Sequence, residues 1–126
     1  MNKQTIRAAG KKALIESIYK YNWLIAHPTE DIPSEYLGCS LCRFAEQVKR
    51  GLKVRKPGIL IFCSACPMHH RWPTNGGGVT EECDDEISIW NDWQHSEREE
   101  KDAGLNIIRC KILVEAFHDR LQEFYR

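Results

Sequence analysis

The sequence lacks a long hydrophobic run, and its first residues lack an apolar leader. The longest uninterrupted apolar stretch is Ile59–Cys63, far short of the roughly 20 residues that a membrane-spanning helix needs. The N-terminal residues run into Lys11 and Lys12 without the apolar segment of a secretory signal. We therefore expect a protein that does not enter a membrane and works in the cytoplasm.

The sequence also lacks a net charge, because 18 basic residues balance 18 acidic ones. Residues 1–60 carry 11 basic and 5 acidic side chains, whereas residues 61–126 carry 7 and 13. This division is typical either of two halves that pack with complementary charge or of a basic face for an anionic partner. A zero formal charge with 29% charged and 10% aromatic residues excludes disorder, and the length of 126 residues predicts a single domain over residues 1–126.

Two long segments have the apolar spacing of helices, near the two ends of the sequence. The first covers residues 5–27 and ends at His27-Pro28, because the residue before proline is disfavoured in a helix. The last covers residues 97–125, with Ser96 as its expected cap and Gly104 as a bend or as its true start. The apolar positions expected on these two helices are Ile6, Ala9, Ala13, Ile18, Tyr21 and Ile25, then Leu105, Ile108, Ile112, Phe117, Leu121 and Phe124.

The middle of the sequence has shorter elements. We expect a short helix that begins at Ser40 and ends at Gly51, a strand over 59–62, a loop over 67–80 and a helix that begins at Asp84. The fold class predicted from this pattern is mainly α. Its long N- and C-terminal helices pack antiparallel on each other, and a central zinc-knuckle region with at most one short hairpin packs against them.

Six cysteines in 126 residues are the feature that stands out. Two Cys-x-x-Cys pairs, separated by 20 residues, are Cys39/Cys42 and Cys63/Cys66. This spacing allows four sulfurs to surround one tetrahedral ion, which favours Zn²⁺ with an iron–sulfur cluster as its main competitor. Disulfides are disfavoured in the cytoplasm. A redox-active pair would need a strand–helix setting that the sequence does not predict.

Several residues could supply the fourth metal ligand. Pro67 follows Cys66 and has no N–H to donate to that sulfur, so Cys83 is the alternative ligand and His69 or His70 could also complete the site. The sixth cysteine, Cys110, is expected in the core, where cysteine behaves as a small hydrophobe.

The motifs of common metalloenzymes are absent: the sequence has no His-Glu-x-x-His and no His-x-Glu beside the paired cysteines. His69-His70 with Asn75 invites comparison with metal-dependent nucleases, but no second ligand cluster follows at a fixed distance. The residues therefore predict a structural metal site and no enzymatic activity.

A basic segment between the two cysteine pairs is the candidate for nucleic-acid or anion binding. It contains Arg43, Lys49, Arg50, Lys53, Arg55 and Lys56.

The order of cysteines also resembles that of small uncharacterised proteins encoded by bacteriophages and prophages. These proteins carry Cys-Pro-Leu-Cys, Cys-x-x-Cys-Pro and one further cysteine between two helices; here Ser40 stands in the place of the first proline. The resemblance covers about residues 10–120 and implies a phage accessory role in the host cytoplasm, such as binding a component of antiviral defence.

The function expected from these observations is non-enzymatic binding of a host protein, which the binding protein then inhibits or redirects. Trp23, Trp72, Trp90 and Trp93 are candidate anchors for such an interface. The alternatives are a zinc-finger-like regulator that binds nucleic acid through residues 43–56, or a binder of a small signalling nucleotide. Self-association of the chain is a further possibility.

Overall fold

The computed structural model describes residues 3–28, 30–36, 38–51, 65–97 and 101–124. The elements follow the order α1 (Lys3–Ala26), the 3-10 turn η1 (Ser34–Tyr36), α2 (Ser40–Gly51), β1 (Trp72–Pro73), β2 (Val79–Thr80), α4 (Ile89–His95) and α5 (Ala103–Phe124). The predicted mainly α fold with one short hairpin is confirmed. The strand predicted over 59–62 lies outside the described residues.

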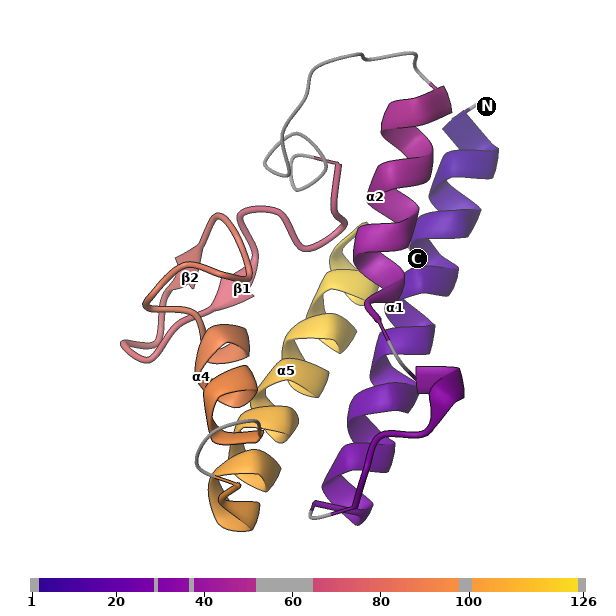
Figure 1. Ribbon diagram of the computed structural model, residues 1–126. Coiled ribbons are helices and arrows are strands. Elements are labelled where there is room, and N and C mark those ends of the chain that lie inside the picture. The colour runs from indigo at the N-terminus through magenta and orange to yellow at the C-terminus, as the bar shows by residue number, and fades with distance from the viewer. Residues whose placement is uncertain (1–2, 29, 37, 52–64, 98–100, 125–126) are drawn as a thin grey trace.

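The long helices α1 and α5 form the most extensive helix pair among the described elements and run antiparallel, as expected (Figure 1). The buried residues of α1 recur at helical spacing on the face turned to α5. The buried residues of α5 recur in the same way on the face turned to α1. These buried residues are Gly10, Ala13, Leu14, Ser17, Ile18, Tyr21 and Leu24 on α1, and Asn106, Cys110, Leu113 and Phe117 on α5. Two positions expected to be apolar contacts, Ile108 and Ile112, are instead 56% and 36% exposed.

The helix α2 packs against α1 through Leu41, Phe44 and Val48, and α4 packs against α5 through Ile89 and Trp93. The core residues of α1, α2, α4 and α5 form one cluster together with Met68 from the turns and Trp72 from β1. Figure 1 shows α2 on one side of α1, and the hairpin with α4 on the other side of α5.

Residues 67–80, expected to be a loop, contain the two-stranded hairpin. Trp72 pairs with Thr80 and Pro73 with Val79 in an antiparallel register. Gly77, with φ at 89°, occupies the left-handed conformation that the tight connection requires. The alternation of apolar and polar residues is too short here for the sequence to have indicated strands.

The expected helix start at Asp84 is wrong, because α4 begins at Ile89 with Ser88 as its N-cap. The Asp85 carboxylate instead accepts hydrogen bonds from the Thr80 hydroxyl and from the Glu82 N–H, which fixes a turn ahead of the helix. An acidic residue that can bond the backbone locally favours such a turn over a helix.

Of the two starts expected for the last helix, the one near Ser96 is wrong, and the one at Gly104 lies one residue from the observed start at Ala103. Asp102 accepts a hydrogen bond from the Leu105 N–H at 3.0 Å and caps α5, so the helix begins at Ala103. Ser96 closes α4, and its buried hydroxyl donates to Asn106 Oδ1 at 2.6 Å. The serine therefore joins the end of α4 to the first turn of α5.

Candidate metal centre

Four of the described cysteines come from three separate segments that pack on the core. Cys39 directly precedes α2, Cys42 lies in its first turn, Cys66 lies in the turns before the hairpin, and Cys83 lies in the turns after it. Cys63, which is also among the four predicted ligands, lies outside the described residues. The structure joins none of the described cysteines in a disulfide.

The sulfur of Cys39 acts as an acceptor at the N-terminus of α2. It accepts hydrogen bonds from the Cys42 thiol and from the backbone N–H groups of Leu41 and Cys42. The Cys42 thiol is the largest cause that lowers the pKa of Cys39 to about 6; burial opposes this shift, and the backbone N–H groups and Lys20 reinforce it. Backbone donors that stabilise a thiolate are what a Cys-x-x-Cys metal knuckle requires.

The pKa of Cys42 is affected by the other three described cysteines of this region, Cys39, Cys66 and Cys83. Its hydrogen bond to Cys39 is the largest cause that raises its pKa, followed by burial and by the negative charges of Cys39, Cys83 and Cys66. Cys66 and Cys83 are therefore close enough to influence Cys42 electrostatically. Both are half-buried and pack against the hydrophobic core. The fold thus brings the alternative ligand Cys83 into the neighbourhood of the first pair.

The four thiols are suitable ligands for a thiophilic ion, but their sulfur atoms are too far apart in this structure to coordinate one ion. Sulfurs that share one Zn²⁺ lie about 3.8 Å apart, given Zn–S bonds of about 2.3 Å in a tetrahedron. Among the described residues, the groups whose ligand atoms all lie within 4.8 Å of one another contain no cysteine. A shared ion would require these turns to close inward on α2, and the ion and its ligand set remain predictions.

The turn that carries Cys66 is fastened to α5. The guanidinium Nε of Arg120 donates to the Pro67 carbonyl at 2.7 Å, and the His69 N–H donates to the Cys66 carbonyl at 3.0 Å. Met68 in this turn is fully buried. Pro67 has no N–H to donate. Its turn is held instead by hydrogen bonds to the carbonyl oxygens of Cys66 and Pro67 and by the burial of Met68.

Cys110 lies in the core, as expected. It is fully buried in the α1–α5 interface, and burial is the largest cause that raises its pKa to about 12. A thiol with so high a pKa stays protonated and unreactive at neutral pH.

The basic segment is described only in part. Arg43 lies on the exposed side of α2 and donates from Nη2 to the Ser40 hydroxyl at 3.1 Å. The structure places the backbone of Lys49 and Arg50 in α2, whereas Lys53, Arg55 and Lys56 lie outside the described residues. Nucleic-acid or anion binding by this segment remains a prediction.

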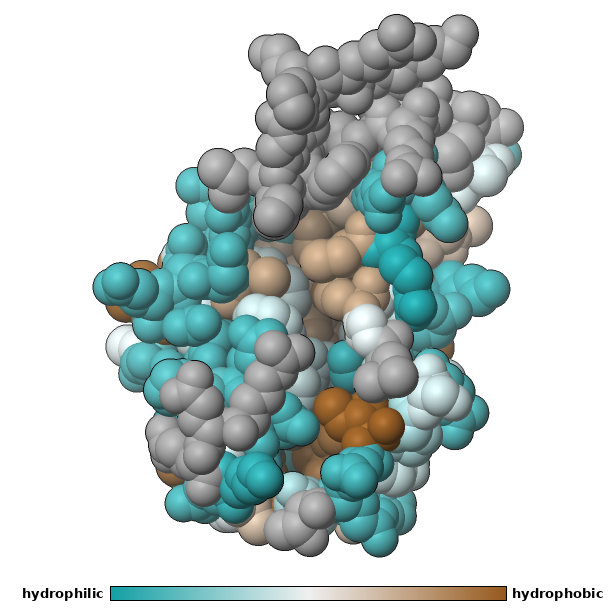
Figure 2. All heavy atoms as spheres, viewed as in Figure 1, coloured by the Kyte–Doolittle hydropathy of each residue, from teal (hydrophilic) through white to brown (hydrophobic). Residues whose placement is uncertain are grey.

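A groove beside the cysteines was not found from the sequence. It is a cavity of about 440 Å³ between α1, the η1 segment and α4, lined among others by Ile32, Tyr36, Cys39, Trp90 and Glu97. Figure 2 shows hydrophobic residues in a hollow bordered by hydrophilic ones on this face. The aromatic residues were candidate anchors, but no spacing in the sequence indicated that α4 and the η1 segment would meet.

The floor of this groove is held by polar contacts as well as packing. Trp90 Nε1 donates to the Tyr21 hydroxyl at 2.9 Å. Lys20 Nζ donates to the Gly38 carbonyl at 2.8 Å and lies 5.4 Å and 5.9 Å from the ring centres of Tyr21 and Trp93. Burial is the largest cause that lowers the pKa of Lys20. Hydrogen bonds therefore tie Trp90 to α1 and Lys20 to the segment before α2 at the floor of the groove.

Comparison of the chain with protein-family models, with curated proteins and with solved structures finds no match. Within the described ranges, no helix has the length and apolar character needed to cross a membrane.

Proposed function

We propose that this chain is a small, non-enzymatic, zinc-stabilised binding protein of phage or prophage origin that binds a host protein. The observation that carries the proposal is the convergence of cysteines from three segments beside α2. Cys39 and Cys42 lie at the start of α2, and Cys66 and Cys83, from turns that follow much later in the chain, pack with Cys39 against the same hydrophobic core. Thiols gathered in this way are the ligands that Zn²⁺ prefers.

The role proposed for the metal is structural. The turns between residues 65 and 88 contain only two strands of two residues each, so little backbone pairing holds them. An ion shared between α2 and these turns would cross-link them and contribute folding free energy directly.

The partner proposed for the groove is a protein segment with an apolar side chain flanked by lysine or arginine. Trp90, Tyr36 and Ile32 offer aromatic and aliphatic contact, the residue types that contribute most to interface energies. Asp31 and Glu97 line both this groove and a neighbouring cavity of about 240 Å³. Lys20 is already engaged by Gly38 and the rings, so the carboxylates favour a basic partner.

Metal content measured together with a thiol count tests the first part of the proposal. We expect one zinc per chain and cysteines that react with a thiol reagent only after a chelator is added. Cys42→Ser should lower the zinc content and Cys110→Ala should leave it at one, because Cys110 lies in the core. Metal-free protein with every exposed thiol reactive would contradict the proposal.

Co-purification from host cells with nuclease treatment tests the second part. We expect a protein partner that survives nuclease and is lost with Ile32→Glu, which places a charge in the groove. The matched control is Ile108→Glu on the exposed face of α5, which should retain the partner. Loss of the partner after nuclease treatment would instead support the nucleic-acid alternative, as would binding that weakens steeply with salt.

A further inference from the structure

A second cluster of metal-ligating side chains lies at the open end of the hairpin. His69 and His70 precede β1, and Glu81 follows β2. Because Trp72 pairs with Thr80, the residues just outside the two strands meet. The His70 N–H donates to the Glu81 carbonyl at 2.9 Å, so the hairpin register itself sets the spacing of the cluster.

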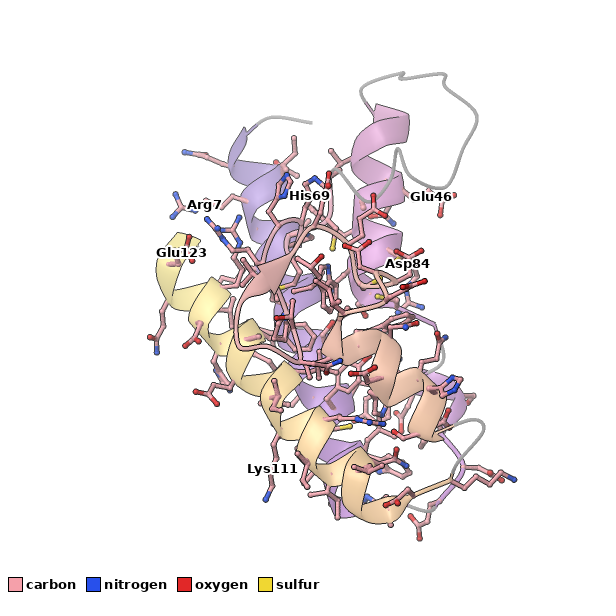
Figure 3. The ribbon with its side chains drawn as sticks, turned by 90° about the vertical axis from the view of Figure 1, so that its left-hand side faces the viewer. Arg7, Glu46, His69, Asp84, Lys111 and Glu123 are labelled. Atoms are coloured by element: carbon pink, nitrogen blue, oxygen red, sulfur yellow. The ribbon has the colours of Figure 1, made fainter. Side chains whose placement is uncertain are left out.

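The three side chains converge on a small volume. One oxygen of Glu81, Oε1, lies 3.5 Å from His69 Nε2 and 4.0 Å from His70 Nε2. The ring centres of the two histidines are 4.1 Å apart, and the ligand atoms of all three residues lie within 4.8 Å of one another. Figure 3 shows His69 at the end of the region of turns that lies away from α4.

These separations are close to those of a bound metal. Nitrogen and oxygen ligands at about 2.1 Å from a tetrahedral ion lie about 3.4 Å apart. The two separations from Glu81 Oε1, 3.5 Å and 4.0 Å, lie near this spacing, so rotations of the side chains can bring the three ligand atoms around one ion. No described cysteine belongs to this cluster.

One histidine of the cluster is largely buried, whereas the other two side chains are open to solvent, from which an ion could enter. The His69 side chain is only 18% exposed, whereas His70 and Glu81 are 63% and 57% exposed. His70 has a φ of 62°, a left-handed conformation that is uncommon for a residue with a side chain. This conformation turns the chain so that two successive residues, which normally point apart, can place their rings side by side.

We propose that His69, His70 and Glu81 form a binding site for a divalent transition metal, separate from the cysteine centre. Two imidazoles and one carboxylate select ions such as Zn²⁺, Co²⁺ or Fe²⁺ over Ca²⁺ and Mg²⁺, which prefer oxygen ligands. With three protein ligands on one side, the ion keeps open positions toward solvent. The site depends on the hairpin and not on the binding partner proposed above.

Cobalt titration of protein loaded with a single equivalent of Zn²⁺ tests the site. The thiolates take that Zn²⁺ first, and Co²⁺, which lies below Zn²⁺ in affinity, does not displace it, so the histidine site stays open for Co²⁺. We expect one further equivalent of Co²⁺ to bind and to shift the ring-proton NMR signals of His69 and His70. His70→Ala and Glu81→Gln should each weaken Co²⁺ binding at least tenfold. The matched control is His118→Ala, an exposed histidine on α5, which should bind Co²⁺ like the unaltered chain.

Three results would overturn the site: no further equivalent of Co²⁺, unchanged affinity in both variants, or absorption from sulfur-to-cobalt charge transfer in the second equivalent. The test remains valid if the cysteines bind no zinc, since the same titration then starts from metal-free protein. Histidine signals that shift without sulfur absorption would support this site even where the zinc proposal fails.

Discussion

The α1–α5 pair and the turns of residues 65–88 are stabilised in different ways. In the helix pair, Leu14, Leu113 and Phe117 are fully buried, and every helical turn bonds its own backbone. In the turns, Met68 and Trp72 are the buried apolar anchors, and the hairpin contributes two residues from each strand. Burial can therefore stabilise the helices alone, whereas the turns depend on contacts made to other elements.

Phe117→Ala should have the largest effect, because this ring serves both regions. It packs 5.6 Å from the ring centre of Tyr21 on α1 and 5.9 Å from that of Trp72 in the hairpin. Truncation of a buried phenylalanine costs about 3–5 kcal/mol, measurable as a lower urea midpoint. Ile112→Ala on the exposed side of α5 should cost less than about 1 kcal/mol. Equal losses in the two variants would contradict the assignment of the core to the inner face.

Arg120→Gln should have an intermediate and local effect. It removes the charged donor that bonds the Pro67 carbonyl at 2.7 Å, and hydrogen bonds from charged groups contribute about 1.5–3 kcal/mol. Amide hydrogen exchange should accelerate in residues 65–71 while the amides of α5 stay protected.

The matched control for Arg120→Gln is Lys111→Gln, which removes a cation from an exposed position of the same helix (Figure 3). Faster exchange along the whole of α5 in the Arg120 variant would show that the two regions unfold together. The conclusion that the helix pair and the turns are stabilised in different ways would then be wrong.

Ser88→Ala should have the smallest effect of the three. The Ser88 hydroxyl accepts a hydrogen bond from the Trp90 N–H at 3.1 Å at the start of α4, and loss of such a cap costs about 1 kcal/mol. Thermal unfolding measures the loss, and Ser34→Ala at an exposed position should leave the midpoint unchanged. A similar loss in both variants would show that the cap does not stabilise α4.

The helices were predictable because their signals are local. The spacing of Ala13, Ile18 and Tyr21 and the break at Pro28 define α1 without reference to any other element. The starts of α4 and α5 were not predictable in the same way. Asp85 and Ser96 have the side chains of helix-start residues, but here they bond Thr80 and Asn106 instead, and those partners are brought near only by the fold.

The candidate sites also include features that the sequence shows directly and features that only the fold creates. The pair Cys39/Cys42 is visible in the sequence because both thiols lie within one helical turn. The approach of Cys83 requires the hairpin to return the chain toward α2, and the meeting of His70 with Glu81 depends on the strand register. The groove joins Ile32 to Trp90, so it depends on how α1 and α4 pack, which residue types alone do not determine.

The pairing of α1 with α5 also governs when the protein can fold. Tyr21 and Phe117 meet across nearly the whole sequence, so the main interface closes a very long loop, and such non-local contacts slow folding. During synthesis, α1 emerges from the ribosome long before its partner exists. Its apolar stripe then stays exposed to water, which makes the nascent chain prone to aggregation or chaperone capture until α5 has been translated.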